Sequence, residues 1–384
     1  MQHKFGALDL IRAGLQDLDK ARTLFDELHN DGIDDDRMRL LLTTLEKACD
    51  PDVALSNLVD IIKVVQSQGE DFTNIIADEN SFIRLITVLG VSDEMGKLMR
   101  FRPELVEAAA NDACESHLYN HEQRRAHVLK SVGADPNDHT MPTASLPLAE
   151  AATALRKTYR KQLAAIMAQD ATANDPITIQ PRISTELSDL ADAALEGALA
   201  IARHEVDGSE HVRFAIIGMG KLGAQELNYV SDVDLIYVVE PADADTNGMT
   251  LSRVGTKMAT TLQRVCQSVI MGVAEPTLWQ IDGGLRPEGK DGPLVRRLES
   301  HEAYYEQWAE NWEFQALLKA RPVAGDSDLG QAYMSMTRPF VWTASKRDNF
   351  VYDCQQTAQT CRRSYPQPAQ RPRNQTRQGR SARR

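Results

Sequence analysis

Residues 214–240, FAIIGMGKLGAQELNYVSDVDLIYVVE, constrain the fold of this chain more than any other stretch. Two apolar, β-rich runs predict two short strands, the first ending near Gly218 and the second starting near Val233. The connection holds GMGKLG, a G-x-G-x-x-G pattern, and SDVD, which begins at Ser231, leads into the second strand. The glycine pattern is typical of a dinucleotide pocket, whereas two carboxylates one residue apart are typical of a metal site.

The dinucleotide interpretation explains the glycines but not the aspartates. A strand precedes the glycines, and Glu240 follows Gly218 by 22 residues, about where a ribose-binding acid is expected. However, the helix of a parallel crossover would have to fit between Lys221 and about Asn228, which is too short. Carboxylates would also stand at the entry of a buried parallel strand, where such runs are apolar. A NAD-dependent oxidoreductase is therefore the weaker alternative.

The metal interpretation uses both features. Alternate residues of a strand share a face, so Asp232 and Asp234 project to the same side. Their charges repel each other, and a magnesium ion, which prefers carboxylates and phosphate oxygens, relieves that repulsion. A third β-rich run at 277–285 contains Asp282, which completes a cluster of three carboxylates if this strand lies beside the second. The glycine turn then lets phosphates approach the backbone closely.

Hydrophobic periodicity predicts an α+β protein with a mainly helical N-terminal block, followed by a small mixed sheet with flanking helices. We expect five regions, namely a helical N-terminal region (1–133), a loop and long helices (134–210), a mixed-sheet core (211–298), the start of a helical domain (299–353) and a basic tail (354–384).

Local signals also predict two helix boundaries. The segment 171–182, ATANDPITIQPR, is expected to interrupt the helical pattern, with the next helix starting near Ser184. Residues 299–320 predict one long amphipathic helix. Its aromatic residues recur on one side and are expected to form a core stripe, namely Tyr304, Tyr305, Trp308 and Trp312.

Composition excludes several classes of protein. There is no apolar run long enough to span a bilayer, and the first residues carry mixed charge, so we expect neither a membrane protein nor a secretory signal. Five dispersed cysteines without a C-x-x-C pair favour the reducing cytoplasm over disulfides or a zinc site. The net charge is −12, and removing the eight arginines of the tail leaves −20 for residues 1–353, which argues against nucleic acid as a partner.

The spacing from Gly220-Lys221 to Asp-Val-Asp resembles the nucleotidyltransferase superfamily related to DNA polymerase β, although lysine stands where that superfamily usually has glycine or serine. Longer segments are more specific, among them VLGVSDEMGKLMRFRPELVEA at 88–108 and IDGGLRPEGKDGPLVRRLESHEAYYEQWAENWEFQALLKARPVAGD from Ile281. They resemble the bifunctional glutamine synthetase adenylyltransferase/adenylyl-removing enzymes, and the resemblance covers nearly all of residues 1–353.

This resemblance implies a position in the adenylyl-removing, N-terminal half of a longer enzyme that uses Mg²⁺ and ATP or ADP to modify a tyrosine of glutamine synthetase. Glutamine and a PII-type signal protein would be effectors of that longer enzyme. By carry-over, magnesium would be held by Asp232, Asp234 and Asp282. The nucleotide phosphates would be bordered by Gly218, Gly220, Lys221 and Ser231. Arg286 is a further candidate for binding phosphate, with an ion pair to Glu288 as the alternative.

The end of the chain raises separate expectations. Lys319 and Arg321 are expected to complement the C-terminus of the preceding helix rather than reach the cleft. Residues 354–384 contain no Leu, Ile, Val, Met or Phe and are expected to be disordered. Back-translated in the adjacent frame, they resemble later segments of the same family, so we hypothesise a frameshift near Asp353 and a truncated product. An inactive docking module of the same fold is the remaining alternative, which the three aspartates disfavour.

Overall fold

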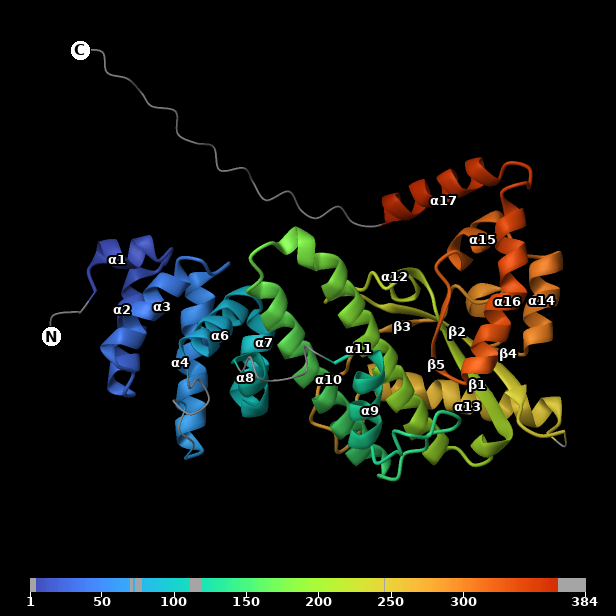
Figure 1. Cartoon of the computed structure of the whole chain (residues 1–384), viewed down its shortest axis with the longest axis horizontal. Coiled ribbons are helices and arrows are strands. Elements are labelled where there is room, and N and C mark those ends of the chain that lie inside the picture. The colour runs from blue at the N-terminus through green and yellow to red at the C-terminus, as the bar shows by residue number, and fades with distance from the viewer. Residues whose placement is uncertain (1–4, 70–71, 73–77, 111–118, 245, 365–384) are drawn as a thin grey trace, which may run out of the picture.

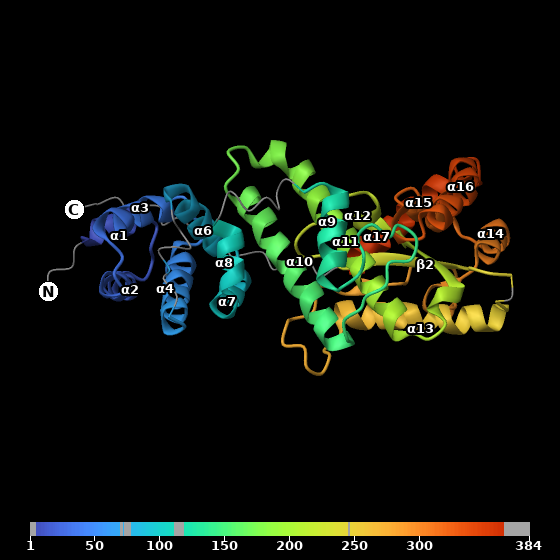
Figure 2. The same ribbon diagram turned by 60° about the horizontal axis from the view of Figure 1, so that its bottom comes forward.

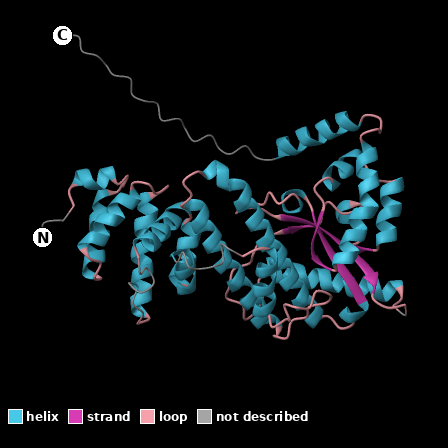
Figure 3. Ribbon diagram, in the orientation of Figure 1, coloured by secondary structure: helices cyan, strands magenta, loops and turns pink. Residues whose placement is uncertain are grey.

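The computed structural model describes residues 5–69, 72, 78–110, 119–244 and 246–364. Helices dominate, and a small mixed sheet of five strands lies at one end of an elongated molecule (Figure 3). This arrangement confirms the predicted α+β class with a helical N-terminal block. Among the described residues, no helix combines the length and the apolar character that a bilayer span requires.

The N-terminal block is built from short helices around one hydrophobic core (Figure 1). Its helices are α1 (Ala7–Arg12), α2 (Leu18–Asn30), α3 (Asp35–Leu45), α4 (Pro51–Ser67), α6 (Glu79–Val91), α7 (Asp93–Phe101) and α8 (Pro103–Ala110). An aspartate caps each of α2, α3, α4 and α6 by accepting a backbone N–H of the first turn, which stabilises these short helices. Helices α4 and α6 pack against each other, and they bury Leu58, Ile62, Leu85 and Leu89 in this core.

One long helix connects this block to the rest of the molecule. Helix α10 (Leu148–Ala171) contributes Ala164 and Ala168 to the N-terminal core and Leu155 to the core beneath the sheet. It packs against α9 (His121–Ser131) and the longer α11 (Pro176–Glu205). In Figure 2, α10 lies between the N-terminal helices and the sheet end of the molecule.

The start of α11 differs from the prediction. The helix begins at Pro176 rather than near Ser184. Asp175 accepts hydrogen bonds from the amides of Ile177 (3.1 Å) and Thr178 (3.3 Å). Pro176, in the first helical position, has no backbone N–H that would need a partner. The sequence pair Asp-Pro is therefore a helix start here, and Pro181 is accommodated inside the helix.

The sheet combines antiparallel and parallel pairing. Its strands are β1 (Val212–Gly218), β2 (Val233–Pro241), β3 (Ile281–Asp282), β4 (Val295–Arg296) and β5 (Arg321–Gly325). Strand β1 pairs antiparallel with β2 and β5, while β3 and β4 pair parallel with successive parts of β2. A dinucleotide fold needs parallel strands on the two sides of its glycine turn. Because β2 runs antiparallel to β1, the oxidoreductase alternative is wrong.

Helices cover both faces of the sheet. On one face, Phe214 and Tyr237 pack against α11 and α13 (Gly248–Gln267). On the other, Ile217 and Ile236 pack against α14 (Leu298–Gln307), α15 (Asn311–Leu317) and α16 (Ser327–Ala344). Two single-turn 3₁₀ helices, Ser209–His211 and Gly289–Asp291, complete the connections. The alternation of inward side chains along β1 and β2 thus fixes two separate cores.

The predicted long helix over 299–320 is interrupted. Glu313 accepts a hydrogen bond from the Glu310 amide (3.0 Å) and starts a new helix, so α14 and α15 are separate. Tyr305 is buried as expected, but Trp308 lies in the break and is 72% exposed, which makes the predicted aromatic core stripe wrong at that position.

Helix α17 (Phe350–Ser364) continues beyond Asp353. The first part of the tail that was expected to be disordered is therefore helical, and residues 365–384 lie outside the described part of the chain.

Candidate active site

The glycine pattern forms a tight turn between β1 and β2. Helix α12 (Gly220–Gly223) follows β1 directly and is as short as the sequence required. The Met219 amide donates to the Asp234 carbonyl (2.9 Å), which ties the turn to β2. Gly220 has φ +54°, and a Cβ atom there would lie 2.5 Å from Asp234 Oδ2. Glycine is favoured at this position, because it adopts the left-handed backbone without strain and leaves the carboxylate in its place.

The other glycines of the pattern are required by packing. A Cβ at Gly218 would lie 2.6 Å from Val323 Cγ1 of β5, and one at Gly223 would lie 1.8 Å from the Lys319 carbonyl oxygen. The turn is thus pressed against the segment that leads into β5. This close packing explains why the sequence matches a dinucleotide pattern without forming that fold.

The strand register brings the predicted carboxylates to one place. Asp234 and Asp282 are direct partners in the parallel pairing of β2 with β3, and Asp232 precedes Asp234 by two residues. Asp232 and Asp282 are exposed and line a hollow of about 300 Å³, whereas Asp234 is half-buried beside the glycine turn. The expectation that the third strand lies beside the second is therefore confirmed.

Two glutamines hold β3 in place although it is only two residues long. The Val233 amide donates to the Gln280 carbonyl (3.0 Å), and the Ile281 amide donates to Gln267 Oε1 of α13 (2.7 Å). Asp282 Oδ1 in turn accepts the Gly284 amide (2.7 Å), which fixes the direction of the carboxylate.

The carboxylates destabilise one another's charge. Burial raises the pKa of Asp234 to about 6, the charges of Asp232 and Asp282 add to this effect, and Lys221 partly offsets it. Nearby cationic side chains do not fully compensate the negative charge of the three carboxylates. Three carboxylate groups that offer oxygen ligands are the kind of site that a divalent cation such as magnesium prefers. The residues present therefore fit magnesium. Ser231 lies partly buried just before Asp232, and Lys221 is exposed on α12.

The guanidinium of Arg286 is hydrogen-bonded to carbonyls of its own loop. Its guanidinium donates to the carbonyls of Gly283 (2.6 Å), Lys290 (3.1 Å) and Gly292 (3.1 and 3.3 Å). Glu288 binds Arg296 instead, so the predicted alternative of an Arg286–Glu288 ion pair is wrong. Arg286 lines the hollow beside Asp232 and Asp282 and braces the loop that forms its wall.

Glu240, which a dinucleotide site would have used, has a structural role. It accepts hydrogen bonds from the Leu298 amide (2.9 Å) and from Arg297 Nε (3.2 Å), at the start of α14. A carboxylate there satisfies an N–H group that the first turn of the helix leaves without a partner.

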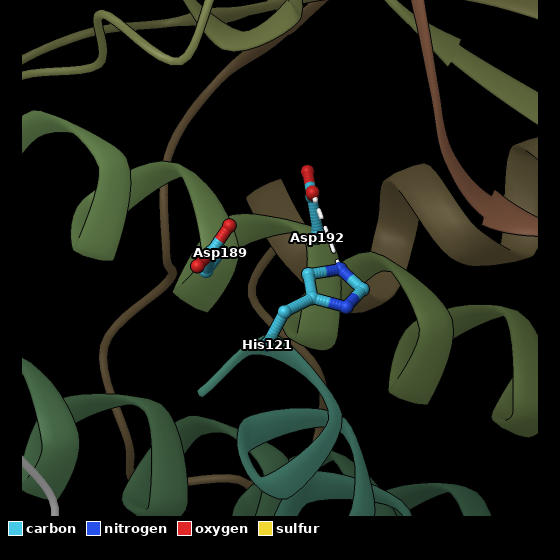
Figure 4. Close-up of side chains that lie close together, drawn as sticks. All are labelled: His121, Asp189 and Asp192. Atoms are coloured by element: carbon cyan, nitrogen blue, oxygen red, sulfur yellow. Dashed lines mark ion pairs between the residues drawn. The ribbon is translucent and has the colours of Figure 1, made fainter. Parts of the chain in front are cut away.

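A second group of titratable residues lies behind the glycine turn and was not predicted. His121 of α9 and Asp189 and Asp192 of α11 bring their ligand atoms within 4.8 Å of one another (Figure 4), a closer spacing than that of the three predicted carboxylates. Both oxygens of Asp192 accept from Arg321, at 2.6 and 3.1 Å, and its bond to His121 raises the pKa of that imidazole. Because a guanidinium already supplies the positive charge, this group does not need a cation.

Sequence analysis missed this group because its members come from different helices. The segment HEQRR at His121 lacks the second histidine that would mark an H-E-x-x-H metal motif, so it gave no signal. Asp189 and Asp192 are three residues apart on one helix face, which was the available signal.

Lys319 and Arg321 were expected to complement the C-terminus of the preceding helix. Lys319 instead pairs with Glu226 (2.6 Å). Arg321 does donate to helix carbonyls, but to those of α12 rather than those of the preceding helix.

Comparisons with known proteins show which sequences this chain is similar to. The family described as glutamate-ammonia ligase adenylyltransferase matches residues 82–336. The chain is 72% identical over 365 residues to a bifunctional glutamine synthetase adenylyltransferase/adenylyl-removing enzyme of Bifidobacterium longum (strain DJO10A), covering 95% of this chain and 34% of that protein. It is 39% identical to the protein of that name from Cutibacterium acnes, covering 90% and 34%. The corresponding Streptomyces avermitilis protein is 38% identical, covering 90% and 32%. The chain thus spans about a third of the length of these relatives.

Proposed function

The chain belongs to the glutamate-ammonia ligase adenylyltransferase family, and from this premise we propose that it performs magnesium-dependent nucleotidyl transfer on glutamine synthetase. Its relatives are named both for adding and for removing the adenylyl group. For this chain we propose the removing direction, in which inorganic phosphate releases AMP from adenylyl-tyrosine as ADP. The pairing of β2 with β3 carries the proposal, because it brings Asp282 next to Asp234 beside the glycine turn.

Asp232, Asp234 and Asp282 would hold the magnesium. The raised pKa of Asp234, caused by burial and by the two neighbouring carboxylates, supports a shared cation at this point. When bound, the ion supplies charge neutralisation for the phosphates that meet there.

The remaining groups align the substrates. Gly220 has no side chain, so phosphate oxygens can approach the backbone beside Asp234. Lys221 and Lys290 are exposed around the carboxylates and attract the anionic phosphate, with Gly218 and Ser231 flanking the same approach. A phosphate oxygen forms a bond to the α-phosphorus, the bond from phosphorus to the tyrosine oxygen breaks, and that oxygen takes a proton. The products are ADP and unmodified tyrosine. Because phosphate attacks directly in this proposal, alignment and charge neutralisation account for the rate without a covalent enzyme intermediate.

Arg286 contributes to this proposal mainly by bracing the wall of the hollow, since most of its donors are engaged with loop carbonyls. We place the reaction in the cytoplasm, with glutamine and a PII-type signal protein as effectors of the longer protein.

The direct test supplies adenylylated glutamine synthetase, phosphate and Mg²⁺ and measures ADP formation. Wild-type protein should form ADP in proportion to added phosphate, and the double variant Asp232→Asn/Asp234→Asn should not, while it melts at the same temperature or higher. Asp207→Asn, which changes an exposed acid outside the site, is the matched control. Equal ADP formation by the double variant would refute the proposed roles. Magnesium binding measured by calorimetry gives a second readout that needs no turnover.

A further inference from the structure

On the side away from Asp234, the glycine turn is contacted by residues that take no part in the proposed chemistry. Arg321, the first residue of β5, donates to the carbonyls of Leu222 (3.1 Å) and Gly223 (3.3 Å). The Gly223 carbonyl is the last of α12, and the Leu222 carbonyl also accepts the Gln225 amide (3.2 Å), so Arg321 joins the bonds that close the end of this short helix. The Lys319 carbonyl also touches the turn, because a Cβ at Gly223 would lie 1.8 Å from it.

Asp192 fixes the direction of Arg321. Its side chain is fully buried on α11 and accepts two hydrogen bonds from the guanidinium, at 2.6 and 3.1 Å. A planar guanidinium held by two parallel bonds cannot rotate without losing both. The rigid side chain of Arg321 therefore connects the long helix α11 to the turn.

A second bond holds the exit of the turn. Gln225 has φ +55°, an uncommon conformation for a residue with a side chain, and its Nε2 donates to Asp189 Oδ1 (3.1 Å). Both anchors thus come from one face of α11, three residues apart. On its other side the turn meets Asp234, through the Met219 amide and through the space that Gly220 leaves free.

We propose that Asp192 and Arg321 are positioning residues for the phosphate-binding turn: they set how closely the backbone of Gly220 lies to Asp234. They touch neither the substrate nor the proposed metal ligands, and they act by fixing α12. The kinetic consequence rests on the proposed function, whereas the anchoring of the turn does not.

The experiment compares Arg321→Lys and Asp192→Asn with Glu186→Gln in the full chain. Glu186 also lies on α11 and forms a buried ion pair with Arg124 (3.1 Å), but it makes no contact with the glycine turn. Hydrogen exchange of the amides in 219–225 is measured by mass spectrometry, and the KM for phosphate and kcat of AMP release are measured in parallel.

We expect exchange in 219–225 to rise about tenfold or more in Arg321→Lys and Asp192→Asn, and to stay unchanged in Glu186→Gln. The KM for phosphate should rise about tenfold in the first two variants, with a smaller change in kcat. Unchanged exchange, or an equal rise in Glu186→Gln, would overturn the inference. If the wild-type protein releases no AMP while exchange responds as expected, the proposed function fails and the anchoring stands.

Discussion

The substitution Gly220→Ala adds one methyl group beside Asp234, and its effect can be worked out from two separate contributions. The first is the backbone, because alanine at φ +54° costs about 1 kcal/mol relative to glycine. The second is the clash of the new Cβ with Asp234 Oδ2 at 2.5 Å, well inside ordinary contact. The flexible end of the aspartate is free to move away by about 1 Å, so the clash is relieved at the expense of the carboxylate's position. A misplacement of that size in a catalytic group lowers the rate by about 100-fold.

Gly208→Ala is the matched control for this prediction. Gly208 has φ +84°, so alanine there carries a similar backbone cost, but its Cβ would meet only ordinary contacts, the nearest being Val254 Cγ2 at 3.6 Å. Both variants should therefore melt about 2 °C lower than wild type. Only Gly220→Ala should lose about 100-fold in kcat/KM for phosphate-dependent AMP release.

The assay combines thermal melting with ADP formation from adenylylated glutamine synthetase at saturating Mg²⁺. Equal activity losses in the two variants would refute the reasoning, because backbone strain alone would then account for the effect. Full activity in Gly220→Ala would refute it as well, since the contact with Asp234 would have no catalytic meaning.

Three further predictions follow from individual side chains. Asp282→Asn should lower magnesium affinity and reduce kcat/KM by about 100-fold. Removing the charge of Asp282 should also lower the pKa of Asp234. Calorimetry across pH measures the magnesium affinity and this pKa, with Asp291→Asn as the control. Arg286→Lys should speed hydrogen exchange across the loop 283–292, and unchanged exchange would show that Arg286 does not brace it. Burial lowers the pKa of His301 to about 3, so below pH 6.5 the unfolded chain binds a proton that the folded chain does not. Stability should fall as pH drops from 6.5 towards 3, by about 1 kcal/mol over the first unit and by about 1.4 kcal/mol per unit below that. Urea unfolding of His301→Gln should lack this part of the pH dependence.

The sheet and the carboxylates were predictable because their signals are local or alternate in a simple way. The runs that became β1 and β2 are apolar on both faces, and the two aspartates share one face through the strand period. Asp282 could be placed beside Asp234 only on the condition that two strands 48 residues apart in sequence pair, a condition that periodicity does not settle.

Other features depend on contacts that no local pattern encodes. Arg286 was predicted to bind phosphate because a sequence does not show that carbonyls of the same loop accept the hydrogen bonds of its guanidinium. Trp308 fitted a helical stripe, but α14 ends at Gln307 and the Glu310–Glu313 cap starts a new helix, which leaves Trp308 in the break. The link from Asp192 to Arg321 joins residues 129 positions apart, so only the folded structure could show it.

The shortness of β3 has a consequence for how the protein loses activity on heating. Asp282 depends on a two-residue strand that is tied to its surroundings by the Val233 amide and by Gln267. Elements with so few backbone bonds open locally before the cores on either face of the sheet unfold. Thermal inactivation should therefore begin several degrees below the cooperative melting transition. The lost activity should return on cooling, because the helices and the central strands stay folded and β3 can pair with β2 again.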